Sequence, residues 1–319
     1  MARIVVSEFM DEQALRDGLA QHDVLYDPKL VDDPVSLVEA VRSADALIVR
    51  NRTQVRGSLL AGATRLRVVG RLGVGLDNID VVACKARGVA VFPAAGANDV
   101  SVAEYVIGTA MALLRRAYSS TPLLAAGKWP REALSNGREI FGKRLGLVGF
   151  GSIARETAKR ALALGMSVAA FDPFVSDTDP AWSSAFGAIE PLPLQELLET
   201  SDVISLHTPL TPQTRGLIDA GALARMKAGA ILINAARGGI VDEAAVADAL
   251  RARELGGAAL DVFDDEPLSA EKPLVFSDAP NLILTPHIAG VTAESNVRVS
   301  RVTVEAVARH LAAMTLRSA

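Results

Sequence analysis

The segment from Lys143 to Asp172 constrains the fold of this chain more than any other stretch. It opens with an apolar run at 145–148, which is typical of a buried parallel strand. Apolar residues then recur at helical spacing until Gly165, and a second apolar run at 167–171 leads directly into Asp172. This order of strand, helix and strand predicts a β–α–β unit of an open parallel sheet.

The turn between the first strand and the helix contains Gly149, Gly151 and Ala154 in the spacing G-x-G-x-x-A. The first glycine permits a tight turn, the second lets the backbone approach a pyrophosphate, and the small third residue lets helix and strand pack closely. The helix N-terminus offers N–H groups to the phosphates. Asp172 can accept hydrogen bonds from both hydroxyls of an adenosine ribose, and no arginine follows it, which favours NAD over NADP. The segment therefore predicts a dinucleotide site, with a purely structural turn as the alternative.

Composition and charge exclude several classes of protein. The chain has 319 residues, of which 50% are hydrophobic and 22% charged, and this favours two globular domains. No apolar run approaches the roughly 20 residues needed to span a bilayer, so no membrane association is expected. The net charge of −4 argues against nucleic acid as a partner. Cys84 is the only cysteine, so no internal disulfide can form and a cytoplasmic location is expected.

Short apolar strands alternate with helical stretches along the chain, which predicts an α/β protein of two doubly wound parallel-sheet (Rossmann-like) domains. We expect a dinucleotide domain at 98–290 and a substrate domain at 1–97 plus 291–319. The substrate domain is discontinuous, because the terminal helix is long enough to return to it. The expected strands and long helices are Arg3–Val6, Ala46–Val49, Val68–Gly70, Val89–Val91, Val100–Arg116, Val203–Leu206, Ala230–Asn234, Asp242–Arg253, Ala258–Val262, Leu282–Leu284 and Ser295–Ala313.

Three side chains that suit acid–base chemistry follow successive strands of the expected dinucleotide domain: Arg237, Glu266 and His287. Hydride transfer from a 2-hydroxy acid needs a base for the hydroxyl proton, and histidine serves this role near neutral pH. A carboxylate beside the histidine orients it and stabilises its charged form, and a guanidinium can hold the substrate carboxylate with two parallel hydrogen bonds. Singly, the three residues can be read as a surface arginine, a solvated acid and a buried histidine. Together they predict a catalytic constellation.

Two further features border the expected site. His207 opens an HTP turn after a strand and is expected to line the cofactor cleft, while no histidine pair has metal-ligand spacing, so no metal is expected. The glycine-rich stretch 70–80 follows another strand and exposes backbone N–H groups that can hold a carboxylate, although a plain turn is the alternative.

The sequence resembles the D-isomer-specific 2-hydroxyacid dehydrogenase family, in the branch of phosphoglycerate dehydrogenases and (S)-sulfolactate dehydrogenases. The resemblance covers nearly the whole chain, and its one departure is Ala154, where glycine is usual. The motifs that carry it are VRNRT, RLGVGLDNID, ANDVSVAEYV, the G-x-G-x-x-A element, HTPLTPQTRGLI, NAARGGIVDE, ALDVFDDEPL and TPHIAG.

The resemblance implies NAD as cofactor, the catalytic roles of Arg237, Glu266 and His287, and a homodimer formed through the long helix and the loop before the glycine motif. It implies cofactor contacts at Gly149, Gly151, Ser152, Ile153, Asp172, His207, Thr208, Pro209, Ala235, Ala236, Asp261, Ala289 and Gly290. It implies substrate contacts at Arg50, Arg71, Leu72, Gly73, Val74, Gly75 and Asn98.

The expected substrate is a small 2-hydroxy or 2-oxo acid with an anionic group on C3. Arg50, Arg52 and Arg71 gather near the carboxylate-binding loop, and Arg131 is a candidate from the dimer partner, although these residues can also form a solvated face. We favour 3-sulfolactate and its oxidation product sulfopyruvate, followed by 3-phosphoglycerate and phosphohydroxypyruvate. The alternatives are a glyoxylate/hydroxypyruvate-type reductase and a non-catalytic NAD-sensing corepressor-like protein. A formate-type dehydrogenase is disfavoured, because it has glutamine in place of Glu266.

Overall fold

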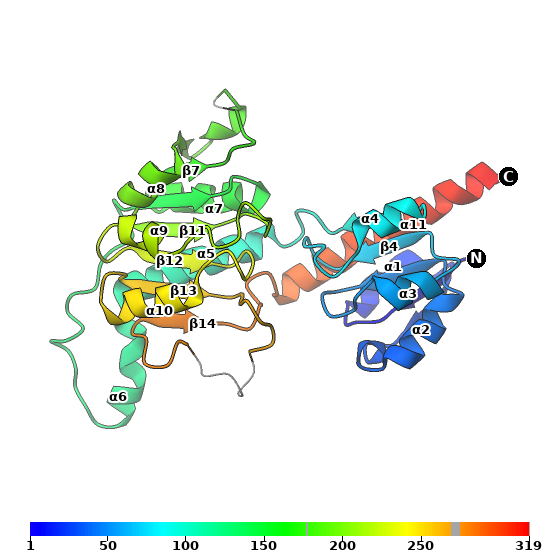
Figure 1. Ribbon diagram of the computed structural model, residues 1–319, viewed down its shortest axis with the longest axis horizontal. Coiled ribbons are helices and arrows are strands. Elements are labelled where there is room, and N and C mark those ends of the chain that lie inside the picture. The colour runs from blue at the N-terminus through cyan, green and yellow to red at the C-terminus, as the bar shows by residue number, and fades with distance from the viewer. Residues whose placement is uncertain (177, 269–274, 319) are drawn as a thin grey trace. The chain divides into compact units, whose positions relative to one another are not determined.

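The computed structural model describes residues 1–176, 178–268 and 275–318. The chain divides into two compact units. Unit 1 comprises Met1–Asn98 and Val291–Ala319, and unit 2 comprises Asp99–Gly290. Because the last helix packs with the N-terminal segment, unit 1 is built from both ends of the chain (Figure 1).

Unit 1 is a five-stranded parallel sheet with helices on both faces, and its strand order is β2-β1-β3-β4-β5. Its elements in chain order are β1 Arg3–Val6, α1 Glu12–Leu19, β2 Asp23–Tyr26, η1 Leu30–Asp32, α2 Pro34–Arg42, β3 Ala46–Val49, α3 Gly57–Gly62, β4 Val68–Arg71, α4 Val81–Ala86, β5 Ala90–Pro93 and α11 Ala293–Ser318.

Alternate residues of the unit 1 strands face opposite layers of helices. Leu47 and Val49 pack with residues of α2, α3 and α4. Ala46 and Ile48 pack with residues of α1 and α11 instead. This period of two follows from strand geometry, and the strands read as continuous apolar runs because both faces are covered.

Unit 2 has a seven-stranded parallel sheet in the order β10-β7-β6-β11-β12-β13-β14, plus a small antiparallel pair, β8 and β9. Its elements are α5 Asp99–Arg115, η2 Ala117–Ser120, α6 Thr121–Ala125, β6 Arg144–Val148, α7 Ser152–Ala163, β7 Ser167–Phe171, η3 Pro180–Trp182, β8 Ser183–Ser184, β9 Gly187–Ala188, β10 Glu190–Pro191, α8 Leu194–Thr200, β11 Val203–Leu206, α9 Ala220–Arg225, β12 Ile231–Asn234, α10 Glu243–Arg251, β13 Gly257–Leu260 and β14 Leu282–Leu284.

The unit 2 sheet is also covered on both faces. Leu145 and Leu147 of β6 pack with residues of α5 and α7, whereas Val148 packs with residues of α8, α9 and α10. The strand order reverses between β6 and β11, because the chain runs outward from β6 to β10 and then returns to begin the other half at β11. In doubly wound sheets this reversal opens a crevice at the carboxyl ends of the strands, where ligands bind. The short segment α6 projects from the body of unit 2 (Figure 1).

The predicted α/β class with two parallel sheets is confirmed, and the expected strands and long helices are present with boundaries shifted by at most five residues. Many helices start where the sequence supplies an aspartate. The side chains of Asp11, Asp33, Asp80, Asp219 and Asp242 each accept a backbone N–H bond at a helix N-terminus. Two strands of the parallel sheets were not predicted, β2 and β10, which lie at sheet edges and are half-exposed or very short. No helix among the described residues is long and apolar enough to cross a membrane.

Candidate active site

The glycine turn of unit 2 is shaped by close contact between two loops at the strand reversal. Gly149 directly follows β6 and has φ of 92°, a conformation that side chains disfavour. A Cβ atom at this position would lie 2.6 Å from the carbonyl oxygen of His207, the residue that follows β11. Only glycine therefore lets the two loops approach this closely. At Gly151, by contrast, a Cβ atom would meet no other atom within 4 Å, so the space above it is open.

The N-terminus of α7 is available to a ligand. Gly151 is the N-cap residue and has no side chain that could cap the helix. Both Gly151 and Ser152 are exposed, and Ala154 is fully buried where the helix packs on the sheet. Exposed N–H groups at a helix N-terminus, together with the helix dipole, form a site for phosphate groups. This end of α7 therefore fits a dinucleotide pyrophosphate.

Asp172 lies immediately after β7 and connects two loops. One carboxylate oxygen accepts from the backbone N–H of Phe150 at 2.8 Å, and the other accepts from that of Phe174 at 2.9 Å. Each oxygen retains a second lone pair, so the side chain can still accept from ribose hydroxyls. The glycine turn is further held by Arg155, whose Nε donates to the carbonyl of Phe150 at 2.9 Å.

His207 is a neutral imidazole beside the glycine turn. Its Nε2 lies 3.0 Å from the hydroxyl of Ser205, and burial lowers the pKa of His207 to about 4. The residues that follow, Thr208 and Pro209, are half-buried and exposed, respectively. They lie at the strand reversal, and their contact with the cofactor stays a prediction.

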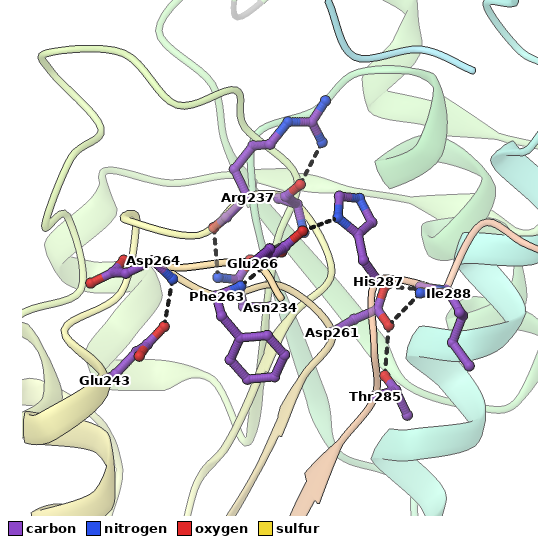
Figure 2. A network of polar contacts seen from close by, with 12 residues as sticks. Asn234, Arg237, Glu243, Asp261, Phe263, Asp264, Glu266, Thr285, His287 and Ile288 are labelled. Atoms are coloured by element: carbon purple, nitrogen blue, oxygen red, sulfur yellow. Dashed lines mark hydrogen bonds and ion pairs between the residues drawn. The ribbon is translucent and has the colours of Figure 1, made fainter. Parts of the chain in front are cut away.

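Glu266 and His287 come together as predicted. Nδ1 of His287 lies 2.7 Å from Oε2 of Glu266, and the second oxygen of Glu266 accepts from the backbone N–H of Phe263 at 3.0 Å (Figure 2). The side chains are 39% and 33% exposed, so solutes can reach the imidazole. Because Nδ1 faces a carboxylate, it carries the proton that donates to Glu266, and Nε2 is the nitrogen that remains for another partner.

Asp261, predicted to contact the cofactor, is buried beneath the loop that carries His287. Its carboxylate accepts from the hydroxyl of Thr285 at 2.6 Å and from the backbone N–H groups of Ile288 and Ala289, both at 2.8 Å (Figure 2). Its carbonyl accepts from the N–H of His287 at 2.8 Å. The side chain therefore holds the 285–289 loop, and its direct contact with the cofactor stays a prediction.

Arg237 lies in the loop after β12, next to the loop that carries Glu266. Its Nη1 donates to the carbonyl of Ala236 at 2.5 Å, and its own carbonyl accepts from the side-chain amide of Asn234 at 2.9 Å. A Cβ atom on Gly238 would lie 1.9 Å from the carbonyl oxygen of Phe263. The two loops are thus in backbone contact, which places Arg237 and Glu266 at the same edge of the sheet. Ala235 and Ala236 are half-buried in this loop. In the loop that carries His287, Gly290 is half-buried and Ala289 is buried.

In unit 1 the predicted substrate residues lie at the carboxyl ends of adjacent strands. Val49 of β3 pairs with Arg71 of β4, so Arg50 and Arg71 share one edge of the sheet. Nη1 of Arg50 donates to the carbonyl of Phe9 at 3.2 Å, and Nη2 lies 2.5 Å from Oδ1 of Asn296. Burial lowers the pKa of Arg50, and the carboxylate of Glu8 opposes this shift. A partly desolvated guanidinium favours an anionic ligand.

The glycine loop after β4 makes room for the Arg71 side chain. A Cβ atom on Gly73 would lie 1.6 Å from Nη1 of Arg71, and that nitrogen donates to the carbonyl of Leu72 at 3.0 Å. Leu72 is buried, whereas Val74 is exposed and Gly75 half-exposed. In the described part of the chain, no backbone carbonyl accepts from the N–H of Val74 or Gly75. These two donors suit a carboxylate.

The remaining predicted residues of unit 1 contribute less. Asn98 ends the first segment of unit 1, and its Oδ1 has no hydrogen-bond partner among the described residues. Arg52 pairs with Asp32 on the surface. Within the described ranges, no cluster of three or more histidine, cysteine, aspartate or glutamate side chains is arranged to hold a metal ion.

Three residues that support these loops were not predicted. The buried Glu8 accepts from the N–H groups of Arg50 and Thr53 at 2.9 Å each and so fixes the loop after β3. Glu243 accepts from the N–H of Asp264 at 2.8 Å and fixes the loop that leads to Glu266. Gly238 allows the backbone contact described above. Glu8 lies two residues after the end of β1, which is a usable signal, but the other two depend on partners more than 20 residues away.

The chain from residue 107 to 289 matches the model of the D-isomer specific 2-hydroxyacid dehydrogenase family, NAD binding domain. The (S)-sulfolactate dehydrogenase of Chromohalobacter salexigens is 55% identical over 311 residues, which cover 98% of this chain and 99% of that relative. The chain belongs to the D-isomer-specific 2-hydroxyacid dehydrogenase family. It is an NAD-dependent oxidoreductase that acts on a CH–OH group, so the predicted cofactor and reaction class are confirmed.

One further relative and one solved structure show how far the similarity extends. The D-3-phosphoglycerate dehydrogenase of Archaeoglobus fulgidus is 37% identical over 99% of this chain, but this chain spans only 59% of that relative. The crystal structure of the TT0316 protein from Thermus thermophilus superposes with a TM-score of 0.84 at 33% identity, and the match covers 98% of this chain and 97% of that one. The dehydrogenase fold therefore extends over both units.

Proposed function

We propose that this dehydrogenase interconverts (S)-3-sulfolactate and sulfopyruvate, with Arg237, Glu266 and His287 as its catalytic residues. The observation that carries the chemical part is the 2.7 Å contact between Nδ1 of His287 and Oε2 of Glu266, at the carboxyl edge of the unit 2 sheet. It provides an oriented imidazole whose charged form is stabilised by a neighbouring carboxylate.

NAD, when bound, accepts the hydride that leaves C2 of the hydroxy acid. The rest of the chemistry belongs to the side chains. Nε2 of His287 takes the hydroxyl proton in oxidation and returns it to the oxygen in reduction. Glu266 offsets the positive charge of the imidazolium while the proton is held. Arg237 is assigned to the substrate, where a guanidinium can bind the carboxylate through two parallel hydrogen bonds and polarise the C2–O bond.

For the cofactor, we assign the glycine turn and the N-terminus of α7 to binding of the pyrophosphate. We assign Asp172 to binding of the adenosine ribose. The uncapped helix end and the open space above Gly151 support this assignment. The neutral His207, with Thr208 and Pro209, is assigned to the neighbouring wall of the cleft.

The choice of sulfolactate rests on a relative and on local charge. The relative at 55% identity is named (S)-sulfolactate dehydrogenase. Arg50 and Arg71 lie at one edge of the unit 1 sheet in a protein of net charge −4, next to the loop whose N–H groups suit a carboxylate. A dianionic three-carbon acid uses both features, because the carboxylate and the C3 sulfonate each need a donor set. The D arrangement at C2 is named (S) in sulfolactate, since the sulfur-bearing branch outranks the carboxyl.

The proposal is tested by NADH oxidation with sulfopyruvate, phosphohydroxypyruvate, hydroxypyruvate, pyruvate and glyoxylate. Sulfopyruvate should give the highest kcat/KM. Arg50→Ala and Arg71→Ala should lower kcat/KM for sulfopyruvate by at least about tenfold and change pyruvate much less. Arg67→Ala is the matched control, because Arg67 precedes β4 and lies at the opposite end of the strand that Arg71 ends. A best rate with pyruvate or glyoxylate, or an unchanged ranking in both variants, contradicts the proposal.

We also propose that the enzyme is a cytoplasmic homodimer. The projecting segment α6 and the residues beside it carry large apolar side chains exposed to solvent. Tyr118, which precedes α6, is 73% exposed, Leu124 within α6 is 45% exposed, and Trp129, which follows α6, is 79% exposed. Exposed apolar clusters of this kind mark protein interfaces. A second copy of the chain is the partner that the family resemblance implies, and the single cysteine agrees with a reducing compartment. Light scattering should give twice the 33.5 kDa chain mass.

A further inference from the structure

A chain of hydrogen bonds connects the long helix α5 with the loop that carries His287. The hydroxyl of Tyr105 lies 2.7 Å from the hydroxyl of Thr285, and the Thr285 hydroxyl donates to Asp261 at 2.6 Å. Tyr105 is half-buried and Asp261 is 1% exposed. Residues 105 and 285 are 180 positions apart, so only the fold brings them together.

The direction of this chain follows from the number of protons available. The Thr285 hydroxyl has one proton to donate. It donates this proton in the hydrogen bond to Asp261, because a carboxylate can only accept. Thr285 therefore accepts from Tyr105, and Tyr105 is the donor. Burial raises the pKa of Tyr105, the bond to Thr285 opposes this, and the charge of Asp261 adds to it. The phenol consequently keeps its proton at neutral pH.

The far end of the chain fixes the backbone at His287. His287 has φ of 55°, a left-handed backbone conformation that residues other than glycine seldom adopt. Asp261 holds this conformation by accepting from the N–H groups of the two residues that follow, Ile288 and Ala289, at 2.8 Å each. Its own carbonyl accepts from the N–H of His287 at 2.8 Å. The position of the Asp261 carboxylate thus sets the position of the imidazole.

We propose that Tyr105 is a positioning residue for His287 and acts through Thr285 and Asp261. Tyr105 selects the Thr285 rotamer that donates to Asp261, Asp261 then fixes the 287–289 backbone, and this backbone aligns Nδ1 with Glu266 at 2.7 Å. The inference rests on the proposed role of His287 in catalysis. It adds a residue of α5 to the site, and it assigns to that residue no contact with cofactor or substrate.

The test uses single-atom and near-isosteric changes along the chain of bonds. Tyr105→Phe removes only the phenol oxygen, Thr285→Val removes the relay hydroxyl, and Thr285→Ser retains it. Thr109→Val is the matched control. Thr109 lies one turn further along α5, is half-buried, and its hydroxyl donates to the helix carbonyls of Tyr105 and Val106 and to no other group that the structure describes. Each variant is checked for folding by circular dichroism and thermal unfolding.

Tyr105→Phe should lower kcat about three- to tenfold, and Thr285→Val about tenfold or more, while KM for the 2-oxo acid and Kd for NADH stay within about twofold. Thr285→Ser should restore most of the rate. The double variant Tyr105→Phe/Thr285→Val should be no slower than Thr285→Val alone, because Tyr105 acts only through Thr285. Multiplicative effects in the double variant, or an equal loss in Thr109→Val, overturn the proposal. If Tyr105→Phe does not fold, the proposal is judged by the two Thr285 variants: Thr285→Val should lose rate and Thr285→Ser should retain most of it.

A measurement that does not depend on turnover, the NMR signal of the His287 ring, distinguishes failure of this proposal from failure of the proposed function. The chain has four histidines, so the ring resonances of His287 can be assigned by comparison with His287→Gln. The His287 ring signal should shift in Tyr105→Phe and Thr285→Val and stay in place in Thr109→Val. An unmoved signal contradicts the positioning role even if the enzyme is active. A moved signal in a protein that reduces no 2-oxo acid supports the positioning role and contradicts the proposed function.

Discussion

Nδ1 of His287 lies 2.7 Å from Oε2 of Glu266, although the two residues are separated by 21 positions and come from different loops. Each loop is held by its own backbone contacts, through Asp261 on one side and through Phe263 and Glu243 on the other. The pair is therefore preorganised before any substrate arrives. Preorganised charge of this kind acts on a transition state without reorganisation during the reaction.

Glu266→Gln should lower turnover, but by less than His287→Ala does. Glutamine keeps the size of the side chain and removes the charge that offsets the imidazolium while His287 holds the proton. His287→Ala should lose roughly two to four orders of magnitude in turnover. Steady-state kinetics of the two variants measure both losses. A Glu266→Gln enzyme with wild-type turnover would refute the pairing.

Gly238→Ala should disturb both stability and catalysis. A methyl group at this position would lie 1.9 Å from the carbonyl oxygen of Phe263, and backbone cannot rotate out of the way as a side chain can. We expect a loss of about 1–3 kcal/mol in the free energy of unfolding and a rise in KM, because Arg237 moves with the loop. Gly108→Ala is the control, since a Cβ atom there meets nothing within 4 Å. Equal behaviour of the two variants would argue against the close contact of the loops.

The parts of this site that depend on local sequence could be predicted, and those that depend on distant partners could not. The G-x-G-x-x-A turn and the strand ends that carry Arg237 and His287 follow from short-range patterns. The contact of Gly238 with Phe263 depends on two loops that the sheet brings together, and no local pattern encodes it. The edge strand β2 was missed because its apolar run, Val24–Tyr26, is short and lies between Asp23 and Asp27. At the edge of the sheet its residues stay exposed or half-buried.

Asp172 should make the enzyme prefer NAD over NADP by a factor of ten or more in kcat/KM, which is at least about 1.4 kcal/mol. Its carboxylate accepts from ribose hydroxyls and repels a 2′-phosphate. Steady-state kinetics with both cofactors measure this ratio. Asp172→Ala should reduce the preference and also weaken binding of both cofactors, because the side chain holds the N–H of Phe150 in the glycine turn. Equal efficiency of wild-type enzyme with NAD and NADP would defeat the assignment.

His207 should contribute a pH dependence to stability. Its pKa is about 4 in the folded chain, against 6.5 for an unperturbed histidine, so the unfolded chain binds the proton first as the pH falls. The stability that its neutral form provides is complete above pH of about 6.5 and is lost as the pH falls towards about 4. Between pH of about 7.5 and about 5, wild type should lose about 2 kcal/mol more than His207→Gln in urea unfolding. Parallel pH dependence of the two proteins would contradict the neutral state of this half-buried imidazole.

The most direct test of the account is the reduction of NAD with the two enantiomers of 3-sulfolactate, followed by NADH absorbance. A site that holds C2 in the D arrangement, with Arg237 on the carboxylate and His287 on the hydroxyl, accepts only the (S) enantiomer. We predict NADH formation with (S)-3-sulfolactate, with kcat/KM at least about a hundredfold above that for (R)-3-sulfolactate and above that for D-lactate. Equal rates with both enantiomers, or no NADH from (S)-3-sulfolactate while D-lactate reacts, would refute this assignment.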